Sequence, residues 1–158
     1  MIKSASEMIC FQEVPDEVSL SFSISNCPYR CEGCHSPHLR TDCGRELGEI
    51  LSPLLEKYNG LISCVLFMGG DDPQQLNELI QWVHICKRYG LKIALYSGQD
   101  NFPTNSELLM WLDYVKVGSY KQALGGLKNL NTNQRLYKKI QGEWKDITYR
   151  FWTSAINK

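Results

Sequence analysis

The chain has 158 residues, the length of one domain, and we expect a single domain over residues 1–158. With 43% hydrophobic and 22% charged residues, and seventeen basic side chains against seventeen acidic ones, the composition excludes an intrinsically disordered chain. No apolar run reaches the ~18–20 residues of a membrane span, and the N-terminus lacks the apolar segment of a signal peptide. We therefore expect a soluble, cytoplasmic protein.

Strands and helices are expected to alternate from residue 18 onward. Apolar and small polar residues alternate over residues 18–25, which predicts a strand. Apolar residues at helical spacing follow over residues 47–58, where Pro53 either interrupts the helix or begins a second one. The wholly apolar run of residues 64–68 ends at two glycines and predicts a strand buried on both faces.

The next strand–helix unit has clearer boundaries. Asp72 is a suitable N-cap for a helix that ends at Gly90. Residues 92–96 then predict a third strand, which ends at Ser97 and Gly98. The strand of residues 64–68 is thus followed by a helix and then by another strand, as in parallel α/β sheets.

The last elements are less distinct. Thr104 and Glu107 form a capping-box pattern ahead of a third helix, and residues 114–117 predict a fourth strand. Residues 119–158 are less regular and form a possible partner-docking segment, with a final strand expected over residues 147–152.

Strands that alternate with helices predict an α/β fold with a mainly parallel sheet. Four or five such units are too few for a closed eight-stranded barrel of ~250 residues, which leaves a partial, open barrel or a doubly wound sheet. In both folds, ligands bind beyond the carboxyl ends of the strands. We therefore expect the segments that follow the first three strands to meet at one edge of the sheet.

Seven cysteines are present, and three of them are close together: Cys27, Cys31 and Cys34. An odd number of cysteines without a secretory signal argues against a disulfide framework. Thiolates spaced C-x3-C-x2-C on one short loop select zinc or an iron–sulfur cluster. A zinc site would need a fourth ligand, which His35 or Cys43 could supply, whereas a cluster held by three cysteines leaves one iron open.

The position of these cysteines resembles a known superfamily. C-x3-C-x2-C after a first strand, followed by Gly69-Gly70-Asp71 after the next strand, resembles the radical S-adenosylmethionine superfamily. Within it, Cys-Pro-x-x-Cys-x-Gly-Cys and the stretch of residues 132–135 (Thr-Asn-Gln-Arg) resemble the activating proteins of anaerobic, class III ribonucleoside-triphosphate reductases. The likeness covers about residues 10–137.

The resemblance implies a fold and an activity. The fold would be a partial, open βα barrel of the radical S-adenosylmethionine type. The three cysteines, as catalytic and metal-binding residues, would hold a 4Fe–4S cluster whose fourth iron binds S-adenosylmethionine. Reductive cleavage of this cofactor would give a 5′-deoxyadenosyl radical, which would take a hydrogen atom from a glycine of the partner reductase. Reduced flavodoxin or a similar protein would supply the electron, with neither a membrane nor a nucleic acid as the expected partner.

Cofactor contacts are expected after each strand, and the resemblance implies that the cofactor's amino group lies against Gly69 and Gly70. Either Asp71 or Asp72 could accept a hydrogen bond from that group, and Asp71 is the first choice because Asp72 already serves as a helix cap. The remaining expected cofactor-binding residues follow or lie in later strands: Ser97, Gly98 and Lys116. Each of these residues also has a purely structural interpretation as a turn residue or, for Lys116, an outward-facing lysine.

Other residues near the motif receive no cofactor role. Gly33 stands where many members of the superfamily carry an aromatic residue. His35, His38 and His84 are expected to be polar loop or helix residues, and Cys64 and Cys86 to be buried in the core. Cys10 and Cys43 have no assigned role, and the four remaining cysteines lack the spacing of a second cluster.

Charge is unevenly distributed along the chain. Residues 1–115 carry eight basic against fifteen acidic side chains, and residues 116–158 carry nine against two. The basic third is typical of a surface for an acidic protein or a nucleic acid, or of opposite charges that face each other within the fold. Arg135, Lys138 and Lys139 could form one basic surface on a helix or a tight loop. The alternative functions are a radical enzyme acting on another protein or small molecule, and a zinc-stabilised binding module.

Overall fold

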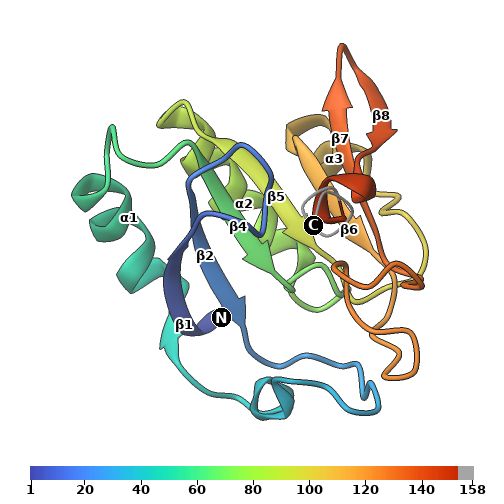
Figure 1. Cartoon of the computed structure of the whole chain (residues 1–158). Helices are drawn as coiled ribbons and strands as arrows, with labels where there is room; N and C mark the ends of the chain where they lie inside the picture. Colours follow the sequence, from blue (N-terminus) through green and yellow to red (C-terminus); the bar gives the residue numbers. More distant parts are fainter. Residues whose placement is uncertain (153–158) are drawn as a thin grey trace.

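The computed structural model describes residues 1–152, which form one eight-stranded sheet in the order β3-β1-β2-β4-β5-β6-β7-β8 (Figure 1). The strands are β1 (Lys3–Cys10), β2 (Ser19–Ile24), β3 (Arg45–Glu46), β4 (Cys64–Met68), β5 (Lys92–Tyr96), β6 (Tyr114–Val117), β7 (Arg135–Ile140) and β8 (Glu143–Asp146). The helices are α1 (Leu47–Lys57), α2 (Leu76–Arg88) and α3 (Ser106–Trp111), with 3-10 turns η1 (Pro37–Arg40) and η2 (Thr148–Phe151).

Four neighbouring strands, β2, β4, β5 and β6, run parallel at the centre of the sheet. Their buried side chains are mostly aliphatic, as expected for strands covered on both faces. Phe22 of β2 lies opposite Phe67 of β4, and the two rings stack with their centroids 5.9 Å apart. The carboxyl ends of these four strands therefore lie along one edge.

The expectation of a partial, open βα barrel with a mainly parallel sheet is wrong. Only three of the seven strand pairings are parallel, and four are antiparallel: β1 with β2, β1 with β3, β6 with β7 and β7 with β8. The sheet is open, with β3 and β8 at its edges. A parallel connection needs a crossover, usually a helix, but residues 118–134 contain none, so β7 returns antiparallel to β6.

The two faces of the sheet are covered differently. The three helices pack on one face, where they form the main core with residues such as Phe22, Val65 and Leu95. The other face carries a smaller buried cluster that includes Leu66, Ala94 and Tyr114 of the central strands, and loops and η2 cover it in place of helices. A hollow can therefore form on this second face.

Most of the expected elements are present, and three of the expected strands have the predicted boundaries. The strands at residues 18–25, 64–68, 92–96 and 114–117 correspond to β2, β4, β5 and β6 and are confirmed. Pro53 lies within α1 and does not divide it. The N-cap of α3 is Asn105, whose side chain accepts a hydrogen bond from the Leu108 N–H, and not Thr104.

The C-terminal third is more regular than expected. Strands β7 and β8 form a hairpin that lies beside β6 (Figure 1). The strand expected over residues 147–152 is wrong, because residues 148–151 form the 3-10 turn η2. The Asp146 carboxylate caps this turn by accepting hydrogen bonds from the N–H and the hydroxyl of Thr148. Within residues 1–152, no helix has the length and apolar character needed to cross a membrane.

Candidate functional site

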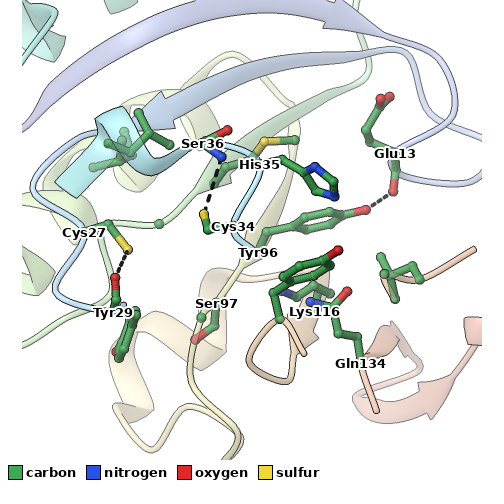
Figure 2. Close-up of a pocket in the computed structure, with 18 of the residues that line it drawn as sticks. Glu13, Cys27, Tyr29, Cys34, His35, Ser36, Tyr96, Ser97, Lys116 and Gln134 are labelled. Carbon is green, nitrogen blue, oxygen red and sulfur yellow. Dashed lines mark hydrogen bonds between the residues drawn. The ribbon is translucent and has the colours of Figure 1, made fainter. Parts of the chain in front are cut away.

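A cavity of about 830 Å³ opens at the carboxyl ends of the parallel strands (Figure 2). Its size lies in the range of small-molecule and cofactor pockets. Eight of the nine residues expected from the sequence line it: Cys27, Cys34, Gly69, Gly70, Asp71, Ser97, Gly98 and Lys116. The ninth, Cys31, lies in the same loop but does not line the cavity. Segments far apart in the sequence therefore meet at the edge of the sheet that the carboxyl ends of the parallel strands form.

The cysteine loop follows β2 and is held in place by η1 and the residues beside it. The Cys27 N–H donates to the Leu39 carbonyl at 2.8 Å, and the Asn26 N–H donates to the Thr41 carbonyl at 3.3 Å. The Arg40 guanidinium donates through Nη2 to the Cys31 carbonyl at 3.0 Å. These bonds join the two ends of the loop, so its cysteines are held beside the cavity.

Two of the three cysteine sulfur atoms form hydrogen bonds, both within the loop. The Cys27 thiol donates to the Tyr29 carbonyl at 3.8 Å, and the Cys34 sulfur accepts a bond from the Ser36 N–H at 3.4 Å (Figure 2). Burial raises the pKa of the Cys27 thiol, and the nearby charges of Cys31 and Cys34 raise it further. Across residues 1–152, no three His, Cys, Asp or Glu side chains are arranged to hold a metal ion.

The chemistry of the residues at the cavity nevertheless suits an iron–sulfur cluster and its cofactor. All three cysteines are free thiols on one loop, and thiolates are the ligands such clusters require. Ser25, which lines the cavity, is fully buried, and its hydroxyl has no hydrogen-bond partner among the described residues. A polar ligand could satisfy that hydroxyl, because buried polar groups are normally paired.

Gly69 and Gly70 turn the chain sharply after β4. Their φ angles are +100° and +92°, a region that side-chain-bearing residues rarely adopt. The turn buries Asp71, whose carboxylate accepts hydrogen bonds from the Ser97 hydroxyl at 2.6 Å and from the Gln99 amide at 3.3 Å. Burial raises the pKa of Asp71, although the Ser97 bond opposes this shift.

Asp72 forms its hydrogen bonds within the turn ahead of α2. Its carboxylate accepts hydrogen bonds from the Gln74 N–H at 3.1 Å and from the Gln75 side chain at 2.7 Å, and so caps the turn that leads into α2. The N-cap of α2 is Gln75 and not Asp72, because the helix begins only at Leu76. Asp71, which is bonded to Ser97 at the end of the next strand, remains the better candidate for a ligand contact.

Gly98 is in close contact with the cysteine loop. A Cβ atom at this position would lie 2.7 Å from Cδ2 of Tyr29, a residue between Cys27 and Cys31. The absence of a side chain at Gly98 therefore allows the Tyr29 ring to pack against the end of β5. Burial raises the pKa of Tyr29 to about 12.

Lys116 points into the cavity, so the outward-facing interpretation is wrong. Only 8% of the residue is exposed, and its ammonium donates to the Gly118 carbonyl at 3.3 Å and lies 5.7 Å from the Tyr96 ring centroid. Burial lowers the pKa of Lys116 to about 8, and the charges of Cys31 and Asp71 oppose this shift. A buried lysine beside a cavity is suited to an anionic group of a ligand.

Several cavity residues were not expected from the sequence. The aromatic residues Tyr96, Tyr120 and Phe151 line it, and the His35 ring lies 5.1 Å from the Tyr120 ring. Gln134 also lines the cavity and is 7% exposed. Tyr96 could have been expected at the site, because it lies at the end of a predicted strand. Tyr120 and Gln134 lie in or beside a long loop whose path the sequence does not reveal.

The other four cysteines do not line the cavity. Cys10, Cys64 and Cys86 are buried, which confirms the core placement of the latter two, and burial raises the pKa of each. Cys43 donates to the His38 carbonyl at 3.5 Å and does not line the cavity. Neither zinc ligand considered from the sequence, His35 or Cys43, completes a metal site within the described part of the chain.

The basic residues of the C-terminal third do not form the expected single surface. Lys138 and Lys139 are neighbours in strand β7, so their side chains point to opposite faces of the sheet. Lys138 lies 5.6 Å from the Tyr114 ring centroid, whereas the Lys139 ammonium donates to the carbonyls of Leu109 and Met110 at the end of α3. Arg135 faces Asp146 at 3.8 Å, so opposite charges within the fold account for part of the asymmetry.

Neither the protein-family models nor the curated proteins contain a match to this chain.

Proposed function

We propose that this chain is an activating enzyme that uses a 4Fe–4S cluster and S-adenosylmethionine to form a glycyl radical on an anaerobic ribonucleoside-triphosphate reductase. One observation supports the proposal above all others: Cys27 and Cys34, which follow β2, line the same cavity as Gly69 and Asp71, which follow β4, and Lys116 of β6. A cofactor that contacts both the cluster and the rest of the chain needs a cavity that the cysteine loop and the other strand ends line together. The resemblance of the cysteine motif supplies the identity of that cofactor.

Each residue of the site has a role in this proposal. Cys27, Cys31 and Cys34 would hold the cluster, since each carries a free thiol on the loop that η1 braces. When bound, the cluster supplies the electron that splits the cofactor's sulfonium bond and so yields a radical that can take a hydrogen atom from glycine. The chain itself binds and orients the cofactor and limits the access of water.

Asp71 and Lys116 are suited to bind the ammonium and the carboxylate groups of an amino acid. The Asp71 carboxylate can accept a hydrogen bond from an ammonium group, with the positive-φ turn at Gly69 and Gly70 allowing close approach. The Lys116 ammonium can pair with a carboxylate, which would offset the cost of burying its charge. Ser97 holds the Asp71 carboxylate in a fixed orientation through its 2.6 Å hydrogen bond.

The proposal also concerns the partner proteins. The substrate would be the catalytic subunit of the reductase, and a reduced flavodoxin or a similar protein in the cytoplasm would donate the electron. Lys128 and Tyr120 line the cavity from the long loop between β6 and β7, so this loop is the segment best placed to meet an incoming polypeptide. The basic surface expected from Arg135, Lys138 and Lys139 is not part of the proposal.

The test is anaerobic reconstitution with iron and sulfide, followed by incubation with S-adenosylmethionine, a reductant and a candidate reductase. We expect a brown protein, release of methionine and a glycyl-radical signal in electron paramagnetic resonance of the reductase. A brown protein that cleaves the cofactor without radicalising any reductase would indicate a radical enzyme with another substrate. A colourless protein that retains zinc would contradict the proposal and favour a zinc-stabilised binding module.

A further inference from the structure

Gln99 joins three segments beside the cavity, although it does not line the cavity itself. Its backbone N–H donates to the Ser97 hydroxyl at 3.1 Å, and its backbone carbonyl accepts a hydrogen bond from the Gly118 N–H at 2.8 Å. Its side-chain Nε2 donates to the Asp71 carboxylate at 3.3 Å. The backbone of Gln99 is therefore fixed at the ends of β5 and β6, and its side chain reaches the turn that follows β4.

The two oxygen atoms of the Asp71 carboxylate have different surroundings. Oδ2 accepts two hydrogen bonds, from the Ser97 hydroxyl at 2.6 Å and from Gln99 Nε2 at 3.3 Å. No side chain among residues 1–152 donates to Oδ1, and Oδ1 is not one of the atoms that are shut off from solvent without a partner. Asp71 lines the cavity, so Oδ1 is the oxygen that remains for a ligand.

The side chain of Gln99 also interacts with the cysteine loop through Tyr29. A side-chain hydrogen bond with Gln99 opposes the rise in the pKa of Tyr29 that burial and the charge of Asp71 cause. Tyr29 belongs to the loop that carries the three cysteines, and Figure 2 shows its ring on the side of the cavity where Ser97 lies. One carboxamide therefore connects the cysteine loop to the carboxylate at the cavity wall.

We propose that Gln99 is a positioning residue for cofactor binding, which holds Asp71 so that Oδ1 faces the amino group of S-adenosylmethionine. Its contact with Tyr29 links this orientation to the position of the cysteine loop. The inference rests on the proposed function for the identity of the cofactor. A carboxylate that is held by one donor can still rotate about its Cβ–Cγ bond, and a second donor behind it restricts that rotation.

The test measures the affinity of two stable probes by isothermal titration calorimetry on the reconstituted full chain. S-adenosylhomocysteine carries the amino-acid group of the cofactor, whereas methylthioadenosine lacks it. We expect Gln99→Met to bind S-adenosylhomocysteine about 2- to 12-fold more weakly, the range for one hydrogen bond, and to bind methylthioadenosine like the wild type. Gln81→Met, in an exposed residue of α2 that does not line the cavity, is the matched control and should bind both probes like the wild type.

Two double-mutant cycles show whether Gln99 acts through Asp71 and together with Tyr29. In an Asp71→Asn background, Gln99→Met should cause no further loss of affinity for S-adenosylhomocysteine, because the carboxylate that it positions is gone. Tyr29→Phe removes only the hydroxyl and should weaken binding of the same probe. Combined with Gln99→Met, it should cost less than the product of the two single effects. Fully multiplicative losses in both cycles would contradict the inference.

The outcomes separate this inference from the proposed function. If Gln99→Met has the melting temperature of the wild type and binds S-adenosylhomocysteine as tightly, the inference is wrong although the proposed function stands. Equal losses of affinity for the two probes would also overturn the inference alone. If Gln99→Met does not fold, Tyr29→Phe decides, since wild-type affinity for S-adenosylhomocysteine in that variant contradicts the link. A wild type that binds neither probe overturns both proposals.

Discussion

The Ser97 hydroxyl donates a 2.6 Å hydrogen bond to the Asp71 carboxylate and so connects the residues that follow two neighbouring strands, β4 and β5. The bond is buried, and Gln99 adds a second donor at 3.3 Å. It fixes a carboxylate at the wall of the cavity, where an ammonium group of a ligand could approach it. The stability of the protein should therefore depend on the ionisation of one buried group.

Asp71→Asn should change how stability depends on pH. Burial raises the pKa of Asp71 in the folded protein above its ordinary value of 3.8, so the folded state favours the protonated form. This contribution is complete below the ordinary value and is lost as pH rises through the raised value. We expect the variant to melt at a higher temperature than the wild type at neutral pH, and the gap to narrow at acidic pH.

Ser97→Ala is the companion variant for this measurement. Removing the donor should raise the pKa of Asp71 further and lower the free energy of unfolding by about 1–3 kcal/mol, the cost of an unpaired buried acceptor. Thermal melting between acidic and neutral pH gives both results. If the melting temperatures of the wild type and Asp71→Asn differ by the same amount at every pH in that range, folding does not raise the pKa of the Asp71 carboxylate.

Gly98→Ala should displace the cysteine loop. The new Cβ would lie 2.7 Å from the Tyr29 ring, so the ring and the backbone that carries it between Cys27 and Cys31 must move. We expect less iron retained per chain after reconstitution, measured by a colorimetric iron assay. Gly126→Ala is the matched control, since its nearest neighbour would lie at an ordinary 3.7 Å. Equal iron content in both variants would mean that Tyr29 does not position the loop.

Lys116 should take up a proton when the cofactor binds. Its pKa is about 8 in the cavity, and pairing with the cofactor carboxylate would raise it. At pH 8 the wild type should therefore take up as much as about half a proton more per ligand than Lys116→Met. Calorimetry of S-adenosylmethionine binding in two buffers of different ionisation enthalpy measures this difference. Identical proton uptake by the two proteins would place the carboxylate elsewhere.

Lys139→Met should destabilise the fold more than Lys138→Met. The Lys139 ammonium donates to two carbonyls at the end of α3, at 2.6 and 3.1 Å, whereas Lys138 contacts the Tyr114 ring. Cations that bond to the last carbonyls of a helix stabilise it, so we expect a loss of about 1–2 kcal/mol in urea denaturation for Lys139. Equal losses would contradict this role. Charge reversal at Lys139 is accordingly a poor probe of partner docking, because it would damage α3.

The sequence predicted the central strands because their burial leaves a simple pattern. Residues 64–68 are wholly apolar and form β4 within the predicted limits. Strand β1 was missed because it is rich in serine and charged residues, and most of its side chains are only partly buried or exposed. Periodicity reports burial, so a strand near the edge of a sheet gives a weak signal.

The barrel prediction failed for a topological reason. The hairpin of β7 and β8 turns at Gln141 and Gly142, both with positive φ, and a two-residue turn with glycine is the available signal for it. Glutamine is uncommon at such a position, so this hairpin is not among the elements expected from the sequence. The meeting of Asp71, Ser97 and Lys116 was nevertheless predictable, because it depends only on the parallel strands β4, β5 and β6.

The most direct test of the central claim is the iron content and cofactor cleavage of single cysteine variants. Cys27→Ala, Cys31→Ala and Cys34→Ala should each fail to cleave S-adenosylmethionine, because each thiolate is proposed to hold one iron. Cys10→Ala and Cys86→Ala are the matched controls, since both residues are buried away from the cavity, and they should keep iron near the wild-type level. Cleavage of S-adenosylmethionine by Cys31→Ala at the wild-type rate would contradict the cluster assignment.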